Sequence, residues 1–285
     1  MDLKQLRQIW REHGFRPKKR LGQNFLIDKN VKNNILDALP PAADRTVVEI
    51  GAGFGVMSFD LAERCGKLFA VEKDSRICGI MDPVFRQKEN ITFTCADILE
   101  LDLRALTGEQ RHLTVFGNIP YCISTPVIVM MVEQRQCIDA VYLVIQEELA
   151  DRLVSPPGSK QYGSISCFTQ FYTGPKKLFR IKKNSFYPRP QVESCLLELE
   201  ILRAPSVRVG DKELMFRIIR KAFSQRRKKI INPLSDGTFK SMNRDEWLAA
   251  FESCGLDASK RAENFSLRDY ARLADAAEAR NKGQG

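Results

Sequence analysis

The chain has 285 residues, of which 44% are hydrophobic and 28% are charged, and this composition predicts a folded protein of about two domains rather than a disordered one. The formal net charge of +10 favours a polyanionic partner. No apolar run approaches the ~20 residues that span a bilayer, and the charged N-terminus argues against a signal or transit peptide, so we expect a cytoplasmic protein without a membrane partner.

The eight cysteines are well separated along the chain, and no two of them form a C-x-x-C pair. Several lie in apolar, strand-like runs, which is typical of small buried residues in a reducing compartment. The two histidines, His13 and His112, do not have the spacing of metal ligands. We therefore expect free, buried thiols and no metal site.

The hydrophobic pattern predicts two short helices near the start of the chain, over residues 3–13 and 31–39. Apolar runs then alternate with spacers of helix length, which is typical of an α/β fold with a parallel sheet covered by helices on both faces. These runs are residues 47–50, 68–71, 91–94, 113–116 and 141–145, and residues 166–172 and 194–202 are expected to be the strands that complete the sheet.

The character of the chain changes after Arg203. Residues 204–211 resemble a linker, and the rest of the chain predicts a small α-helical domain. The expected helices of this domain are residues 213–223, 244–254 and 266–279.

Basic charge is concentrated in two places. Residues 176–229 contain 16 basic and 5 acidic side chains, and this stretch includes the run Arg226, Arg227, Lys228 and Lys229. A smaller cluster lies near the N-terminus, at Arg16, Lys18, Lys19 and Arg20. Basic charge gathered in this way favours nucleic-acid binding, and a solvated basic surface is the alternative.

A glycine-rich turn follows the first strand of the sheet. Residues 47–50 lead directly into Gly-Ala-Gly-Phe-Gly at residues 51–55, and a helix is expected over residues 56–64. Glycines allow positive φ and a close approach of the backbone to a ligand. Glu72 ends the second strand, where a carboxylate can accept both hydroxyls of a ribose, and Asp97 follows the third, where it can accept from an adenine amine. Because ligands of open parallel sheets bind at this edge, an adenosine-bearing cofactor is the leading ligand.

The fourth strand ends at the motif Asn118-Ile119-Pro120-Tyr121. The Asn118 side chain and a backbone carbonyl held rigid by the X-Pro bond are two acceptors that can take both hydrogens of an exocyclic amine. Drawing the amine of adenine toward a tetrahedral geometry exposes its lone pair, which is positioning and electrostatic catalysis. Tyr121 can stack on the base. The alternative is a buried turn with a structural asparagine.

A second aromatic candidate is Phe186. Pro188 and Pro190 keep its segment extended, so we expect the chain to present Phe186 from a loop, where it can stack on a base displaced from a helix. The alternative is a hydrophobic plug between domains.

Together these motifs resemble the ribosomal RNA adenine dimethyltransferases, over nearly the whole chain and closest to the small-subunit type. Residues 19–26 are similar to the segment that closes over the cofactor in that family, and residues 49–55 are similar to its glycine loop. Residues 118–121 resemble its catalytic N-[LI]-P-Y motif, and Phe186 with Pro188, Pro190 and Val192 resembles its F-x-P-x-P-x-V motif.

The resemblance implies a Rossmann-like class I S-adenosylmethionine-dependent methyltransferase sheet with a small C-terminal α-helical domain. Residues 1–203 would form the S-adenosylmethionine-binding catalytic domain and residues 204–285 the helical RNA-binding domain. The activity implied is dimethylation of two adjacent adenosines near the 3′ end of 16S rRNA during small-subunit biogenesis, and we expect a monomer. The resemblance assigns cofactor contacts to Asn24, Leu26, Gly51, Glu72, Asp97 and Asn118, catalysis to Asn118, Ile119, Pro120, Tyr121 and Phe186, and RNA contacts are expected at Arg226, Arg227, Lys228 and Lys229.

Two other functions remain open at this stage. One is an Erm-type 23S rRNA adenine methyltransferase, because Ile119 is typical of that group, although residues 124–126, 222–229 and 261–266 are similar to the small-subunit pattern. The other is a non-catalytic RNA-binding or transcription factor on the same fold. The chain also departs from the small-subunit pattern in two places, with Cys122 where asparagine is usual and Ala52 where proline is common.

Overall fold

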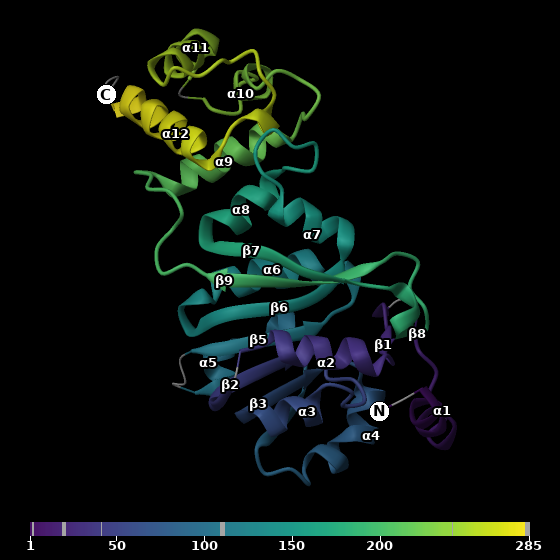
Figure 1. Cartoon of the computed structure of the whole chain (residues 1–285). Helices are drawn as coiled ribbons and strands as arrows, with labels where there is room; N and C mark the ends of the chain where they lie inside the picture. The colour runs from purple at the N-terminus through teal and green to yellow at the C-terminus, as the bar shows by residue number, and fades with distance from the viewer. Residues whose placement is uncertain (2, 19–20, 41, 109–111, 241, 283–285) are drawn as a thin grey trace. The chain divides into compact units, whose positions relative to one another are not determined.

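The computed structural model describes residues 1, 3–18, 21–40, 42–108, 112–240 and 242–282 (Figure 1). Two members of the N-terminal basic cluster, Lys19 and Arg20, lie outside these described residues. The chain divides into two compact units. Unit 1 comprises Met1–Ala150 and Gly174–Ile201, and unit 2 comprises Asp151–Thr173 and the chain from Leu202 onward.

Unit 1 is built on a mainly parallel sheet whose strand order, within the described residues, is β4-β3-β2-β5-β6-β9-β7. The five strands from β4 to β6 run parallel, and β9 is antiparallel to β6. All five parallel strands were predicted from the apolar runs. The strand bounds are β2 Ala42–Ile50, β3 Cys65–Glu72, β4 Ile91–Cys95, β5 Leu113–Asn118, β6 Ile138–Gln146, β7 Thr173–Ile181 and β9 Ser194–Ile201.

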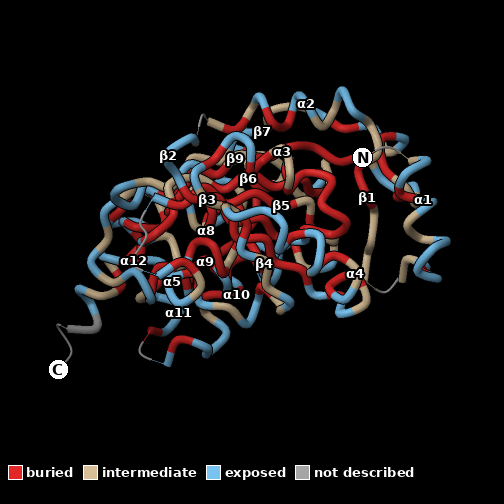
Figure 2. Tube along the Cα trace, turned by 90° about the horizontal axis from the view of Figure 1, so that it is seen from below, coloured by how far each residue is buried: buried red, intermediate tan, exposed pale blue. Residues whose placement is uncertain are grey.

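Helices cover the sheet of unit 1. In Figure 1, α2 crosses the near face of the sheet and α6 lies behind it. Figure 2 shows that the central strands are buried. Burial on both faces explains why the sequences of these strands are continuously apolar. The bounds in unit 1 are α1 Leu3–Glu12, α2 Lys29–Ala38, α3 Ser58–Arg64, α4 Ser75–Phe85, α5 Leu103–Thr107 and α6 Ser124–Glu133, and α7 Glu147–Val154 follows β6. The bounds in unit 2 are α8 Ser164–Tyr172, α9 Lys212–Phe223, α10 Ile231–Leu234, α11 Arg244–Ser253 and α12 Leu267–Lys282.

The strand register brings the predicted site residues to one edge of the sheet. Ile50, the last residue of β2, is paired with Gly117 of β5. The glycine turn that follows β2 and the Asn118 motif at the end of β5 therefore begin side by side at the edge of the sheet. Glu72 is paired with Cys95, which places Asp97 close to the end of β3. Parallel strands have their carboxyl ends on a common edge, and this edge is where open α/β sheets bind ligands.

A small antiparallel ribbon joins two segments that are far apart in the sequence. β1 (Phe25–Leu26) pairs with β8 (Phe186–Tyr187), with Leu26 opposite Phe186. The expectation that a loop presents Phe186 is therefore wrong. Phe186 is 3% exposed, because its side chain belongs to the same hydrophobic core as those of Phe25 and Leu26 in the paired strand.

Residues 166–172 form part of helix α8, not the expected strand. The residues are strand formers by type, but Cys167 and Phe171 lie four residues apart and are both buried, which is the spacing of one helix face. The Ser166 hydroxyl also accepts from the Gly163 amide at the start of the helix, 3.0 Å away. The outer strand of the sheet is instead β7 (Thr173–Ile181).

The division of the chain differs from the expected boundary after Arg203, because residues 151–173 belong to unit 2. Aromatic contacts explain this grouping. The rings of Phe171 in α8 and Phe216 in α9 are 5.2 Å apart, and those of Tyr162 and Phe223 are 6.0 Å apart. The helices expected after residue 212 are all present as α9, α11 and α12.

Two of the eight cysteines are not free thiols, contrary to the expectation. Cys78 in α4 and Cys95 at the end of β4 form a disulfide, with their Cα atoms 5.8 Å apart. Cys122 is free but exposed, whereas the other free cysteines are buried. Among the described residues, none of the helices has the length and apolar character needed to cross a bilayer.

Candidate active site

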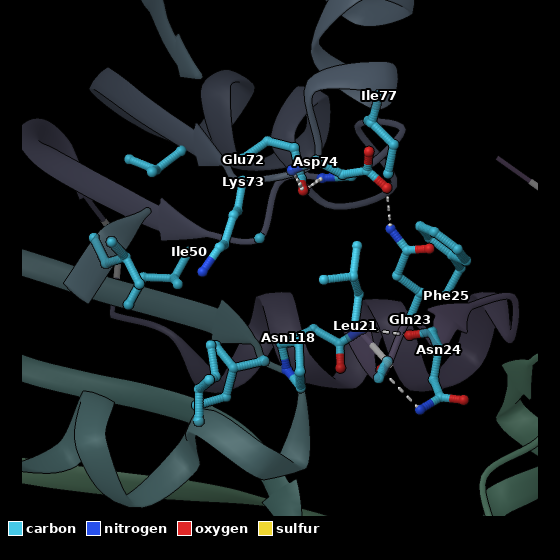
Figure 3. A pocket seen from close by; sticks show the side chains of 18 of the residues that line it. Leu21, Gln23, Asn24, Phe25, Ile50, Glu72, Lys73, Asp74, Ile77 and Asn118 are labelled. Carbon is cyan, nitrogen blue, oxygen red and sulfur yellow. Dashed lines mark hydrogen bonds between the residues drawn. The ribbon is translucent and has the colours of Figure 1, made fainter. Parts of the chain in front are cut away.

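A pocket opens at the carboxyl edge of β2, β3, β4 and β5 in unit 1 (Figure 3). Its wall is completed by residues 21–25 of the N-terminal segment and by Phe186 from β8. The structure thus gathers residues that the sequence spreads over more than 160 positions. The predicted site residues that line the pocket are Asn24, Gly51, Glu72, Asp97, Asn118, Ile119, Pro120, Tyr121 and Phe186.

The glycine turn has the backbone conformation that its sequence predicts. Gly51 has φ +76° and Gly53 has φ +54°, values that side chains other than glycine rarely adopt. The amide of Gly51 donates to the carbonyl of Val71, 2.8 Å away, which ties the turn to the end of β3. A Cβ at Gly53 would lie 3.3 Å from the Phe25 ring. Glycine is therefore required at both positions, and at both the turn lines the pocket.

Glu72 is held in one orientation by backbone amides. Its Oε2 accepts from the Gly53 amide at 2.9 Å, and its Oε1 accepts from the Asp74 amide at 2.8 Å. The residue is 8% exposed, and burial raises the pKa of its carboxyl group. Each carboxylate oxygen has a second lone pair, so Glu72 can accept two further hydrogen bonds from a ligand in the pocket.

Asp97 is also held in place, partly by a residue that the sequence analysis missed. Its Oδ1 accepts from the Leu99 amide at 3.2 Å, at the start of a short 3₁₀ turn. Its Oδ2 is paired with the ammonium group of Lys73, and this pairing raises the pKa of Lys73. Figure 3 shows Lys73 extending from the turn after β3 into the pocket. A lysine directly after the ribose-binding candidate was the available signal.

The Asn118 motif is tied to the N-terminal segment and to β9. The Asn118 amide nitrogen donates to the Asn24 carbonyl at 3.2 Å, which orients the side-chain oxygen as the acceptor end. The Pro120 carbonyl already accepts from the Ile123 amide at 3.1 Å. The Tyr121 hydroxyl lies 2.7 Å from the Ser194 hydroxyl, and burial raises the pKa of the phenol. Ser194 is a further residue that the motif alone does not reveal.

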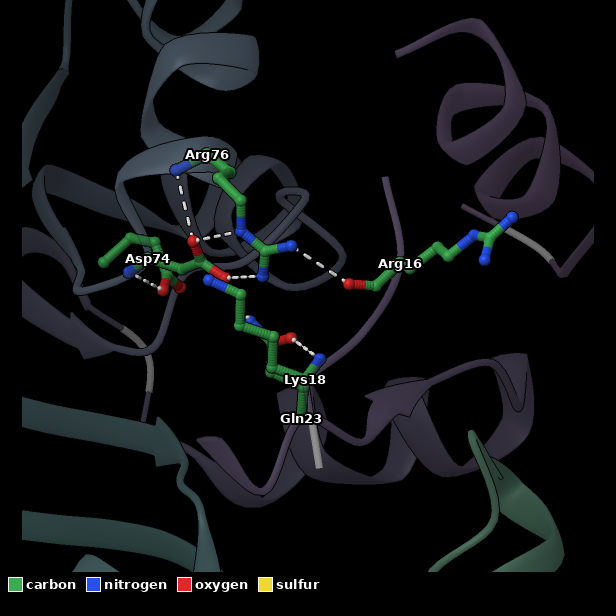
Figure 4. A network of polar contacts seen from close by, with 6 residues as sticks. Arg16, Lys18, Gln23, Asp74 and Arg76 are labelled. Atoms are coloured by element: carbon green, nitrogen blue, oxygen red, sulfur yellow. Dashed lines mark hydrogen bonds and ion pairs between the residues drawn. The ribbon is translucent and has the colours of Figure 1, made fainter. Parts of the chain in front are cut away.

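The N-terminal segment is fastened across the pocket by a buried carboxylate, Asp74 (Figure 4). Asp74 is 6% exposed, and its Oδ2 accepts from the Gln23 amide at 2.8 Å. Its Oδ1 accepts from Arg76 Nε at 3.0 Å, and Arg76 also donates to the Arg16 carbonyl at 3.1 Å. Burial alone would raise the pKa of Asp74, but hydrogen bonds from Arg76 and Gln23 outweigh it and lower that pKa. This polar network holds the segment on which Asn24 lies.

Some predicted residues do not line the pocket. Leu26 is buried in the core of unit 1 and is not one of the residues that line the pocket. In unit 2, Arg226 donates to the carbonyls of Lys160 and Tyr162, at 2.6 and 2.7 Å. Its guanidinium group is therefore engaged within the unit. The side chains of residues 227–229 are exposed to solvent. Within the described part of the chain, no His, Cys, Asp and Glu cluster is arranged to hold a metal ion.

Comparison with known proteins identifies similar sequences over almost the full length. The family model described as ribosomal RNA adenine dimethylase matches residues 14–278. The ribosomal RNA small subunit methyltransferase A of Alkaliphilus oremlandii is 34% identical over 275 residues, which cover 95% of this chain and 96% of that protein. The protein of the same name from Bacillus licheniformis is 34% identical over 274 residues, covering 94% of each chain.

Solved structures share the fold. A dimethyladenosine transferase from Plasmodium falciparum superposes with a TM-score of 0.74 at 20% identity, over 87% of this chain and 95% of that one. The 23S rRNA methyltransferase ErmE superposes with a TM-score of 0.69 at 20% identity, over 90% of this chain and all of that one. The expected class I methyltransferase sheet is thereby confirmed.

Proposed function

The chain belongs to the ribosomal RNA adenine dimethylases, and on that basis we propose that it dimethylates two adjacent adenosines near the 3′ end of 16S rRNA, using S-adenosylmethionine. One observation carries the proposal: the cofactor candidates Glu72 and Asp97 and the amine-binding candidate Asn118 line a single pocket. The full-length similarity to small-subunit methyltransferases supports the 16S substrate over the Erm-type alternative. We further propose a monomer that acts in the cytoplasm.

The pocket fits the proposed cofactor. Gly51 and Gly53 line the pocket without side chains, which suits the methionine end of the molecule. Glu72 would accept the two ribose hydroxyls, and Asp97 would accept the adenine amine. Asn24 and Gly51 would complete the contacts. When bound, S-adenosylmethionine supplies an electrophilic methyl group. The structure of the chain then has to bring a nucleophile in line with that group.

Asn118 is proposed to orient the nucleophile, which is the exocyclic amine of the target adenosine. Its amide nitrogen is engaged by Asn24, so its oxygen would accept one hydrogen of the amine. The carbonyl held rigid by the X-Pro bond is that of Ile119, and it would accept the other hydrogen. These two acceptors favour a tetrahedral nitrogen with an exposed lone pair, and preorganised acceptors of this kind lower the barrier without a strong base.

The target base is proposed to be held by stacking. Tyr121 is anchored through its hydroxyl to Ser194, which fixes the position of the ring at the pocket wall. Phe186 forms part of the pocket wall and is buried, so a base that contacts it must leave its helix and enter the pocket. Stacking on an aromatic side chain stabilises a captured base by about 1–3 kcal/mol. The exposed basic residues 227–229 of unit 2 are proposed to bind RNA phosphates.

Primer extension tests both the reaction and the substrate. A dimethylated adenine cannot form a normal base pair, so it stops reverse transcription. We expect stops at two adjacent adenosines near the 3′ end of 16S rRNA from cells with the gene, and none from cells without it or with the Asn118→Ala variant. Stops in 23S rRNA instead would establish the Erm-type activity. Identical patterns in all cells, together with no binding of radiolabelled S-adenosylmethionine, would establish a non-catalytic protein.

A further inference from the structure

Helix α1 presents a row of basic side chains to solvent. Lys4, Arg7 and Arg11 are exposed, and their spacing of three and four residues places them on one face of the helix. None of the ion pairs found among the described residues involves these three side chains. We refer to Lys4, Arg7 and Arg11 as the α1 basic face. Its charge is not neutralised by the part of the chain that the structure describes.

The opposite, apolar side of α1 is already used for packing within unit 1. Leu6 is 1% exposed, and the Trp10 ring lies 5.6 Å from that of Phe25 and 5.5 Å from that of Tyr187. An amphipathic helix binds a membrane by inserting its apolar face into the lipid. That face is not available here. The charged side is therefore the surface that α1 offers to a partner, which favours a soluble polyanion.

The α1 basic face is connected directly to the pocket wall. The Arg7 guanidinium carbon lies 4.8 Å from the centre of the Tyr187 ring. Tyr187 is the second residue of β8, next to the pocket-lining Phe186, and it pairs with Phe25 across the ribbon. Figure 1 shows α1 beside β1 and β8 at one end of unit 1. A polyanion bound on α1 would thus lie next to the wall against which the target base is proposed to stack.

We propose that the α1 basic face binds the phosphate backbone of the RNA strand that carries the target adenosine, and so guides that base toward the pocket. Lys4 and Arg11 are seven residues apart, about 10 Å along the helix axis. This is about the axial rise of three nucleotide steps, which join four successive phosphates, in one strand of a duplex. The inference rests on the proposed function, because it takes the partner to be the RNA substrate.

The test compares two triple variants that each remove three exposed basic residues from unit 1. The first is Lys4→Ala, Arg7→Ala and Arg11→Ala. The matched control is Lys29→Ala, Arg86→Ala and Lys88→Ala, at positions exposed elsewhere in the unit. The probe is an RNA transcript of the 3′ domain of 16S rRNA, titrated at several salt concentrations. Tryptophan fluorescence in a Trp247→Phe background, in which Trp10 is the one tryptophan of the sequence, reports whether α1 remains packed. Lys4→Glu with Arg11→Glu provides a second variant that retains the Arg7 contact.

For the α1 variants we expect at least a tenfold weaker RNA affinity at low salt. The slope of log K against log salt should fall by about 2 to 3, since each lost phosphate contact contributes about 0.9. S-adenosylmethionine affinity and the single-turnover rate at saturating RNA should match wild type. A salt slope equal to that of the control triple variant would overturn the proposal. The proposal would also be overturned if the α1 variants bound RNA as wild type does but no longer bound vesicles of anionic lipid. If wild type neither binds the RNA nor methylates it, the proposed function has failed instead.

Discussion

Gln23 and Asp74 are 51 residues apart in the sequence, and the Gln23 side-chain amide donates a 2.8 Å hydrogen bond to the buried Asp74 carboxylate. The Asp74 side chain also accepts from the Arg76 backbone amide and so caps the start of α4. The N-terminal segment that lines the pocket is thereby attached to the carboxyl edge of the sheet. We predict that the pocket wall formed by residues 21–25 depends on this long-range contact.

Gln23→Ala should weaken S-adenosylmethionine binding about tenfold. The substitution removes a hydrogen bond to a charged group, which contributes about 1.5 to 3 kcal/mol, and it releases residues 21–25 from the pocket wall. Isothermal titration of the folded variant measures the effect. Gln8→Ala is the control, because Gln8 is exposed on α1 and bonds only locally to Glu12. Equal affinities for both variants would show that the contact does not support the site.

Glu72→Ala should weaken cofactor binding by about 1.5 to 3 kcal/mol, the range for hydrogen bonds to a charged acceptor. The variant also leaves the Gly53 and Asp74 amides without their acceptor. Thermal unfolding must therefore accompany the calorimetric titration. Glu72→Gln, which keeps the size of the side chain, separates the two effects. Unchanged affinity in a folded variant would remove Glu72 from the ribose site.

Glu49 predicts a specific dependence of stability on pH. It is buried in β2, and burial, with a smaller contribution from nearby Glu72, raises its pKa from 4.5 to about 8. Between these values the folded state retains a proton that the unfolded state has released. The free energy of unfolding should therefore fall as pH rises from about 4.5 to about 8. The contribution of one group cannot exceed about 1.4 kcal/mol per pH unit.

Glu49→Gln should remove this part of the pH dependence and leave the variant more stable than wild type near pH 8. Urea unfolding at several pH values across the range measures the slope for each protein. Glu89→Gln, at an exposed position, provides the control. If wild type and Glu49→Gln have parallel stability profiles, Glu49 does not hold a proton in the folded state.

The basic run of unit 2 should divide into two roles. Arg226→Ala should lower thermal stability, because its guanidinium group donates to the carbonyls of Lys160 and Tyr162. Arg227→Ala with Lys228→Ala should leave stability near wild type but reduce the salt slope of RNA binding by about 2. Thermal melts and salt-dependent RNA titrations distinguish these effects. If Arg226→Ala kept the thermal stability of wild type but reduced the salt slope of RNA binding, Arg226 would be an RNA-binding residue instead.

The parallel core of the sheet could be predicted from the sequence because burial on both faces leaves a continuous apolar run at each strand. The motifs after β2, β3, β4 and β5 follow from the same rule, since parallel strands share a carboxyl edge. Local pattern was misleading at residues 166–172. Their strand-forming residue types are outweighed by helix packing of Cys167 and Phe171 and by the Ser166 bond at the helix start.

Contacts between distant segments could not be predicted in this way. The Gln23–Asp74 bond and the Cys78–Cys95 disulfide depend on how α4 returns to the sheet, which no local motif encodes. The burial of Phe186 depends on its pairing with Leu26 in a ribbon of two short strands. The two prolines correctly indicated an extended segment, but an extended segment can pair with a distant strand as readily as it can form an exposed loop.

The central claim is that Asn118 orients the amine of the target adenosine for methyl transfer. Single-turnover methylation at saturating RNA and S-adenosylmethionine tests it most directly, with Asn118→Ala compared to wild type. Because Asn118 also contacts the Asn24 carbonyl, a cofactor titration must confirm saturation in the variant. Loss of one preorganised electrostatic partner predicts a rate that is ~100- to 1000-fold lower. A single-turnover rate close to that of wild type would contradict the mechanism.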